Sequence, residues 1–301
     1  MALRGLVGRT KRPHVISCVT EHKSVLGTLS ALRKDGVDVT LLPVDENGMI
    51  DPDDVENALR PATVLVSVMW VNSEIGCIQP IQTLGQMCRS RGVVFHTDAA
   101  QAFGKIDIDV VRDHVDLLSF SAHKIYGPKG IGGLFVSPLV RKRLRPLITG
   151  GDQQGGLRAG TVPTALAVGF GAAAALMRSE NATDTRHIAA LQKKFWTALR
   201  TTIDGVHLNG SLDHRIEGNL NFRIDEVDAD SLLLALPGLA ISTGSACTAG
   251  ALEPSTVLMA LGLTRDQAAQ SVRIGLGRMS TESDVEKAVA EIGRAVGRLR
   301  A

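Results

Sequence analysis

The sequence has no long hydrophobic run, no excess of one charge and no internal repeat, and each absence excludes a class of protein. Among its 301 residues, 33 basic and 31 acidic side chains are interspersed, and the net charge is only +2. Such a balance provides no basic surface for nucleic acid or for a charged membrane. The alanine-rich segment 168–176 is too short to span a bilayer. We therefore expect a soluble protein that binds neither nucleic acid nor a membrane.

Cysteines are few, and no two of the four form a C-x-x-C pair. This spacing argues against a zinc site, so we expect no metal, and against a disulfide framework, which fits a reducing compartment. Cys18, Cys77 and Cys88 stand inside strand-like or helix-like patterns, where we expect small buried side chains. Cys247 stands in a loop of small residues, Ser-Thr-Gly-Ser-Ala-Cys-Thr-Ala-Gly, which has almost no apolar bulk to bury it.

The N-terminal segment, residues 1–12, is basic, and no acidic residue occurs before Glu21. It lacks the continuous apolar core of a secretory signal. Two interpretations remain, a transit peptide or the end of a surface helix that leads into a strand at 14–19. We favour the surface helix because serine and threonine are scarce in the segment.

Hydrophobic residues make up 44% of the 301 residues, which is enough for the core of one large domain or of two modest domains. In the first half, strand-like and helix-like stretches alternate, which predicts an α/β fold with a mostly parallel central sheet wrapped by helices. The pattern changes after a glycine-rich loop, so we predict a large domain at 1–182 and a smaller α/β domain at 183–301. Predicted strands are 14–19, 37–43, 63–70, 93–97, 117–121, 131–137, 218–224, 239–242 and 271–276, and predicted helices are 24–35, 51–59, 81–91, 164–178, 188–202 and 283–299.

Polar clusters follow three predicted strands, at the carboxyl ends where α/β sheets bind ligands. They are Asn72-Ser-Glu, Asp98-Ala-Ala-Gln, and a run that ends His123-Lys124. Lys124 is a candidate amine for a Schiff base with pyridoxal phosphate, and Asp98 is a candidate carboxylate that keeps the pyridine nitrogen protonated. Taken alone, each residue is better explained as a surface lysine or a capping aspartate.

Six motifs in the same order resemble the group I cysteine desulfurases, which are fold-type I pyridoxal-phosphate enzymes of the class V aminotransferase superfamily. The resemblance covers nearly all 301 residues. It implies an enzyme that removes sulfur from L-cysteine, giving L-alanine and a persulfide on Cys247 for iron–sulfur cluster assembly or tRNA thiolation. The motifs are Thr20-Glu-His-Lys, His96-Thr-Asp-Ala-Ala-Gln, the run Ser119 to Gly130, Gly156-Leu-Arg-Ala-Gly-Thr, Ser242-Thr-Gly-Ser-Ala-Cys and Ser271-Val-Arg-Ile-Gly-Leu-Gly-Arg.

The resemblance also implies the role of each site residue. Lys124 would bind the cofactor and move the substrate Cα proton, His22 would stack on the ring and act in acid–base steps, and Cys247 would accept the sulfur. Asp98 would pair with the pyridine nitrogen and Gln101 with the ring hydroxyl. Ser121, His123 and, from the partner subunit, Thr161 would bind the phosphate, Ser73 would lie near the ring oxygen, and Arg273 and Asn72 would bind the substrate.

Four departures from the family's pattern bear on activity. The phosphate loop that precedes the family's counterpart of residues 1–8 does not precede them here, which would remove a helix N-terminus from the phosphate. A start-site error, a fragment and a genuine short form each explain it. In addition, Ser73 replaces a usual asparagine, Gly156 replaces a common arginine, and the chain stops at Ala301, short of the tail that engages the iron–sulfur scaffold protein.

Three hypotheses arise from the motifs and the departures. The first is an active desulfurase that uses L-cysteine, forms a homodimer and passes sulfur to an iron–sulfur scaffold or another acceptor protein. The second is a truncated, non-catalytic paralogue that binds partners or dimerises with a full-length subunit. The third is a selenocysteine lyase-like enzyme. We favour the first, in the cytoplasm, or in mitochondria if the source is a eukaryote.

Overall fold

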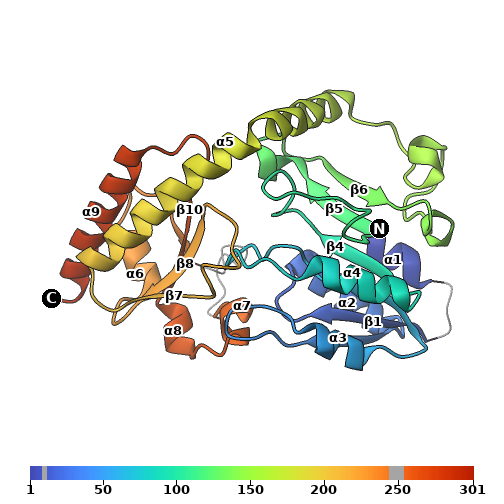
Figure 1. The fold of residues 1–301 in the computed structure, drawn as a ribbon, viewed down its shortest axis with the longest axis horizontal. Helices are drawn as coiled ribbons and strands as arrows, with labels where there is room; N and C mark the ends of the chain where they lie inside the picture. Colours follow the sequence, from blue (N-terminus) through green and yellow to red (C-terminus); the bar gives the residue numbers. More distant parts are fainter. Residues whose placement is uncertain (9–11, 244–253) are drawn as a thin grey trace. The chain divides into compact units, whose positions relative to one another are not determined.

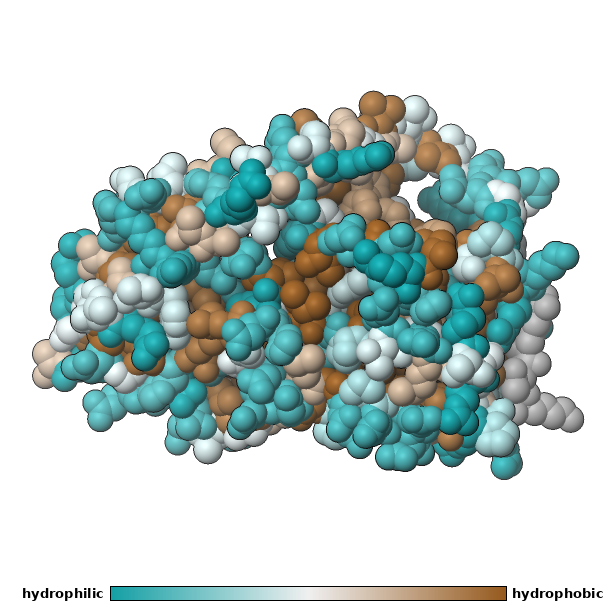
Figure 2. Space-filling view, viewed as in Figure 1, coloured by the Kyte–Doolittle hydropathy of each residue, from teal (hydrophilic) through white to brown (hydrophobic). Residues whose placement is uncertain are grey.

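The computed structural model describes residues 1–8, 12–243 and 254–301, which form two compact units (Figure 1). Unit 1 contains Met1–Val44, Met49–Asn72 and Gln79–Ser179. Unit 2 contains Asp45–Gly48, Ser73–Ile78 and Glu180–Ala301. In the described parts of the chain, no helix combines the length and the apolar character needed to cross a membrane. Hydrophilic side chains cover much of the face seen in Figure 2, in keeping with the interspersed charges.

Unit 1 is built on a six-stranded sheet with the order β2-β1-β3-β4-β5-β6. The first five strands run parallel to their neighbours, and β6 runs antiparallel to β5. The predicted α/β fold with a mostly parallel central sheet is thereby confirmed. The strands are β1 (His14–Cys18), β2 (Asp38–Leu42), β3 (Thr63–Ser67), β4 (Val94–Asp98), β5 (Leu117–Ser121) and β6 (Gly132–Val136).

The inner strands of the sheet are buried on both faces. All five residues of β1 are buried, and Leu65 and Val66 of β3 are fully inaccessible, as a continuous apolar run predicts. Helix α2 (Lys23–Lys34) buries Val25, Leu29 and Leu32, which share one helical face. Unit 1 also contains α3 (Pro52–Ala58), α4 (Ile81–Ser90) and the short helices η1 (Ala122–Ile125), η2 (Arg141–Arg143) and η3 (Gln153–Gly156).

The N-terminal helix α1 (Ala2–Val7) corrects one prediction. A helix is present, but it is a buried one, because Ala2, Leu3, Leu6 and Val7 pack into the core of unit 1. The scarcity of serine and threonine in the segment had suggested a surface helix. In contrast, the prediction that Cys18, Cys77 and Cys88 are buried is confirmed, whereas Cys247 lies outside the described residues.

Unit 2 is an antiparallel four-stranded sheet with the order β7-β8-β10-β9. The second half of α5 (Thr164–Thr202) and α9 (Glu282–Leu299) cover one face of it, where Phe195, Phe222 and Ile292 are almost inaccessible (Figure 1). The remaining elements are β7 (Val206–Leu208), β8 (Asn219–Ile224), α6 (Ala229–Leu234), β9 (Ser242–Thr243), α7 (Thr256–Ala260), α8 (Arg265–Ala269) and β10 (Ser271–Gly275).

Helix α5 corrects a second prediction, since the sequence suggested two helices at 164–178 and 188–202. The structure has one helix of 39 residues. The polar residues 179–187 were interpreted as a break, but they include neither proline nor glycine, so nothing in them ends a helix. The predicted strand at 239–242 is also wrong for most of its length, because the N–H groups of Leu239 and Ile241 donate to the nearby carbonyls of Leu236 and Leu239, and only the two-residue β9 pairs in the sheet.

Candidate active site

Three neighbouring strands of unit 1 bring the predicted site residues to one edge of the sheet. Strands β3, β4 and β5 are adjacent, and Asp98, the last residue of β4, lies opposite Ser119 of β5. The turn η1, which carries Lys124, begins directly after β5. Because these strands are parallel, their carboxyl ends meet at the same edge, as predicted from the sequence.

The carboxylate of Asp98 is partly buried, and two ionisable neighbours act on its pKa. Burial raises the pKa of Asp98, whereas the Ala100 N–H, His22 and Lys124 each lower it. The imidazole and the amine are therefore close enough to act electrostatically on this carboxylate. The Asp98 Oδ1 atom also accepts the Ala100 N–H at 2.9 Å, so the same side chain shapes the turn that follows β4.

His22 is exposed at the start of α2, where it is the N-cap residue. Its Nδ1 atom accepts the Ser24 N–H at 3.2 Å and lies 2.8 Å from the Ser24 hydroxyl. These contacts hold the ring by one nitrogen and leave the ring face uncovered by them. A face held in this way suits stacking on a flat aromatic ring.

The short helix η1 presents His123 and Lys124 outward. Its other residues, Ala122 and Ile125, are buried and anchor the turn. The turn ends at Tyr126, which has φ +64°, and the Gly127 N–H donates to the Ala122 carbonyl. The side chains of His123 and Lys124 are thus exposed, while the buried Ala122 and Ile125 hold the backbone of the turn in place.

Ser121, at the end of β5, has a buried hydroxyl for which the described residues supply no hydrogen-bond partner. Such a group is costly unless something outside these residues pairs with it. Phosphate oxygens are strong acceptors, so the unpaired hydroxyl fits a phosphate-binding role. Thr161 is exposed in the glycine-rich loop of unit 1.

The turn after Asp98 holds one residue that sequence reasoning missed. The Lys105 Nζ atom donates to Gln101 Oε1 at 2.8 Å, and burial, followed by repulsion from Lys124, lowers the pKa of Lys105 to about 8. The spacing of four residues was the available signal, because such pairs meet on a helical turn.

His96 of β4 bridges three strands below the site. Its Nδ1 lies 2.8 Å from the Ser67 hydroxyl of β3, and its Nε2 lies 2.9 Å from the Ser119 hydroxyl of β5. Burial lowers the pKa of His96 to about 3. The imidazole is therefore neutral at physiological pH and serves the structure of the sheet edge.

The buried imidazole predicts that unit 1 loses stability in acid. Below pH 6.5 His96 binds a proton in the unfolded protein but stays neutral in the folded protein. The free energy of unfolding therefore falls as the pH drops from 6.5 toward 3. Between about pH 6.5 and pH 5 the loss should be about 2 kcal/mol. Urea unfolding at both pH values measures it, and His96→Gln should reduce the difference. Exposed His214→Gln is the control, and an unchanged pH dependence in His96→Gln would contradict the assignment.

Two of the predicted residues, Arg273 and Ser73, lie in unit 2. Arg273 of β10 donates through Nη1 to the Ser73 carbonyl at 2.9 Å and through Nη2 to the Ser242 hydroxyl at 3.0 Å. Its planar fork is therefore held in place, which suits bidentate binding of a carboxylate. Asn72, in unit 1, is buried and donates through Nδ2 to the Thr20 carbonyl at 3.0 Å. Its predicted contact with substrate stays a prediction.

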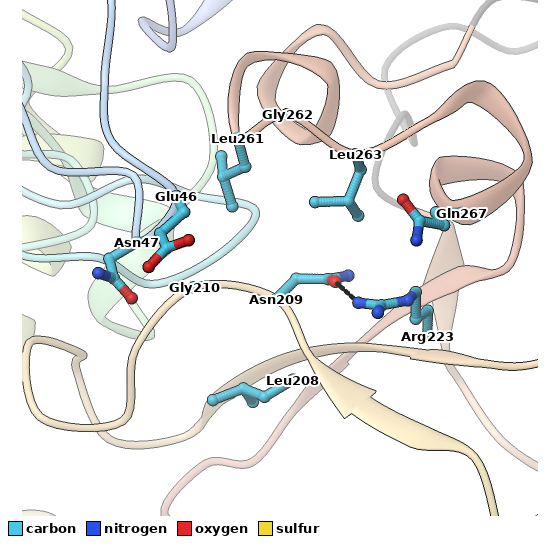
Figure 3. Close-up of a pocket in the computed structure, with 10 residues that line it drawn as sticks. All are labelled: Glu46, Asn47, Leu208, Asn209, Gly210, Arg223, Leu261, Gly262, Leu263 and Gln267. Carbon is cyan, nitrogen blue, oxygen red and sulfur yellow. Dashed lines mark hydrogen bonds between the residues drawn. The ribbon is translucent and has the colours of Figure 1, made fainter.

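A pocket of about 300 Å³ lies within unit 2 (Figure 3). It is lined by Glu46, Arg223 and Gln267 among polar residues, and the Arg223 guanidinium lies 3.4 Å from Asn209 Oδ1. Among its described lining residues there is none that the sequence predicted for the site. The chemistry predicted for the chain is therefore not located in this pocket.

Comparison with known proteins identifies the family. The aminotransferase class-V model matches residues 2–288. The chain is 47% identical over 302 residues to cysteine desulfurase IscS of Rickettsia bellii, and the match covers 100% of this chain and 74% of that protein. It is also 47% identical to the mitochondrial cysteine desulfurase of Arabidopsis thaliana, covering 100% of this chain and 67% of the plant protein.

Solved structures agree with these relatives. A NifS-like protein aligns with a TM-score of 0.91 and 30% identity, covering 99% of this chain and 79% of that chain. A structure described as SspA in complex with cysteine aligns with a TM-score of 0.80 and 37% identity, covering 93% of this chain and 78% of that chain. The chain therefore belongs to the class-V aminotransferases and, within that family, to the cysteine desulfurases.

Proposed function

We propose that this chain is a pyridoxal-phosphate-dependent cysteine desulfurase, which converts L-cysteine to L-alanine and carries the sulfur as a persulfide on Cys247. The observation that supports it best is the electrostatic coupling of Asp98 with both His22 and Lys124 at one sheet edge. A carboxylate, an imidazole and an amine are the groups that hold this cofactor in enzymes. The relatives named cysteine desulfurase, and a similar structure described in complex with cysteine, support the same substrate.

The residues of unit 1 fit the cofactor. Asp98 suits the pyridine nitrogen, Gln101 the ring hydroxyl, and the unpaired Ser121 hydroxyl the phosphate. His123 is exposed beside Lys124 and suits the phosphate as well. When bound, pyridoxal phosphate supplies an electron sink for the substrate's Cα carbon. Thr161 of the partner subunit and Ser73 complete the proposed set.

The remaining site residues act in the steps of the proposed reaction. Lys124 attaches the cofactor and moves the Cα proton through its amine. Arg273 binds the substrate carboxylate with its fork, and Asn72 belongs to the same proposed set. The Cys247 thiolate attacks the substrate sulfur, the carbon–sulfur bond breaks, and the sulfur stays on the enzyme as a persulfide while alanine leaves. His22 stacks on the ring and assists proton transfer.

The proposal extends to partners, location and domains. A homodimer would bring Thr161 to the partner's site, and exposed Leu147 and Ile148 beside its loop offer apolar surface for such contact. An iron–sulfur scaffold or another sulfur acceptor would take the persulfide sulfur. We assign the protein to the cytoplasm, or to mitochondria if eukaryotic, and we place the domain division between residues 182 and 183.

Alanine and sulfide formation from cysteine, with pyridoxal phosphate added, tests the function. The informative variant is Asp98→Asn, because the asparagine oxygen can still accept the Ala100 N–H and only the charge is lost. We expect alanine formation to fall about 10- to 100-fold, the size of one lost charge-assisted hydrogen bond. The exposed Asp54→Asn is the matched control. Wild-type protein that forms no alanine with added cofactor would refute the proposal.

A further inference from the structure

The turn that follows β4 contains a polar contact for which the proposed reaction has no use. The ammonium group of Lys105 lies 2.8 Å from Gln101 Oε1. Gly104, between them, has φ +76°, and a Cβ atom there would lie 2.8 Å from Ile125 of η1. The turn is therefore packed tightly against the helix that carries Lys124, and Lys105 has a defined place in it.

The contact fixes which end of the Gln101 amide is free. A lysine ammonium has three donors and no acceptor, so it can bind only the amide oxygen. The NH₂ group of Gln101 is then left to donate elsewhere. The ring oxygen of pyridoxal phosphate is an acceptor, so this orientation of the amide matches the cofactor. With the amide reversed, its oxygen would face the ring oxygen, and two acceptors would repel each other.

The position of Lys105 is unfavourable for its positive charge. It is partly buried, and both burial and the nearby Lys124 ammonium oppose its charge. Among the described residues, Gln101 is the acceptor of its hydrogen bond. At neutral pH it is mostly protonated, since its pKa is about 8. Burial and the neighbouring Lys124 make a protonated Lys105 unfavourable at this position. This argues that Lys105 has a function at the site beyond holding the turn.

We propose that Lys105 is a positioning residue that locks the Gln101 amide with its NH₂ group toward the ring oxygen of the cofactor. This inference rests on the proposed function, because it requires the cofactor to bind beside Gln101. Lys105 itself touches neither the substrate nor the cofactor in this role. Loss of its ammonium group would let the amide rotate and weaken the bond to the ring oxygen.

The test compares pyridoxal phosphate with its 3-deoxy analogue, which lacks the ring hydroxyl, by titrating each into cofactor-free protein at neutral pH. Lys105→Met should bind pyridoxal phosphate about tenfold more weakly than wild type, but the analogue within about twofold. Lys105→Arg keeps a donor-only cation and should restore most of the affinity. In a Gln101→Leu background, Lys105→Met should cause no further loss.

A second readout is the pH midpoint of the visible band of the bound cofactor. Lys105→Met should raise it, because the ring oxygen loses a donor and holds its neighbouring proton more tightly. Equal weakening for both ligands, or no weakening, would overturn the inference and assign Lys105 to the stability of the turn. Wild-type protein that binds neither ligand would instead refute the proposed function, and the inference with it.

Discussion

Lys124→Ala should give a folded protein that no longer binds pyridoxal phosphate covalently and forms alanine at least about a thousandfold more slowly. The primary amine is the proposed point of attachment and the proposed carrier of the Cα proton, so one substitution removes both tasks. The side chain is exposed, and Ala122 and Ile125 anchor the turn without it. We therefore expect little change in the urea unfolding midpoint. Borohydride reduction followed by mass spectrometry measures the attachment.

Two controls separate chemistry from charge in this experiment. Lys124→Arg keeps the positive charge near Asp98 but has no primary amine, so it should be as inactive as the alanine variant. Lys129→Ala removes an exposed lysine five positions further along and should keep full activity. Attachment that survives in Lys124→Ala and disappears in Lys129→Ala would move the site to the other lysine.

Cys247→Ala should also lower sulfide and alanine formation at least about a thousandfold, while leaving the visible band of the bound cofactor unchanged. The expected difference from Lys124→Ala is the diagnostic point, because the cysteine acts on the substrate sulfur and not on the cofactor. Mass spectrometry of the wild type after a short incubation with cysteine should find an added mass of about 32 Da, one sulfur atom, on the peptide that contains Cys247.

Cys88→Ala is the matched control for the thiol. Cys88 is fully buried in α4, and burial, with a contribution from Asp116, raises its pKa to about 12. It has almost no thiolate at neutral pH, so it cannot serve as the nucleophile. Activity should remain in Cys88→Ala. A Cys247→Ala enzyme that still forms alanine at the wild-type rate would contradict the proposed sulfur transfer.

The edge of the sheet that carries the site could be predicted because it depends on local signals. Asp98 directly follows the predicted strand 93–97, and Lys124 comes three residues after the predicted strand 117–121. That parallel strands end together is a property of the architecture. The side-by-side order of β3, β4 and β5 was an inference from that architecture, and the structure confirms it.

Other features could not be predicted because they depend on contacts distant in the sequence. The burial of α1 requires the core of unit 1, which no property of residues 2–7 alone reveals. Strand β9 exists only where its residues pair with β10, a strand about 30 positions further along the chain. The hydrogen bond from Lys105 to Gln101 could have been predicted from their spacing of four residues. Only the structure shows that Lys105 is also close enough to Lys124 for the two charges to repel.

The roles of the site residues remain predictions, and the structure supports some of them more directly than others. Asp98, His22 and Lys124 are supported by the electrostatic effect of the imidazole and the amine on the pKa of Asp98. Arg273 is supported by the hydrogen bonds that hold its guanidinium. Cys247 rests on its sequence context and on the family, since it lies outside the described residues.

The uninterrupted helix α5 sets a rule for changes in chain length. A loop of polar residues at 179–187 would absorb an insertion or a deletion with little effect on the segment after it. In a continuous helix, each added or removed residue turns the next segment by about 100° and shifts it by about 1.5 Å along the axis. An insertion between residues 184 and 191 would therefore shift Asp184, which pairs with Arg278 in unit 2, relative to Leu191 and Phe195, which pack in the core of the same unit. Substitutions should be tolerated in this stretch, whereas single-residue insertions should not.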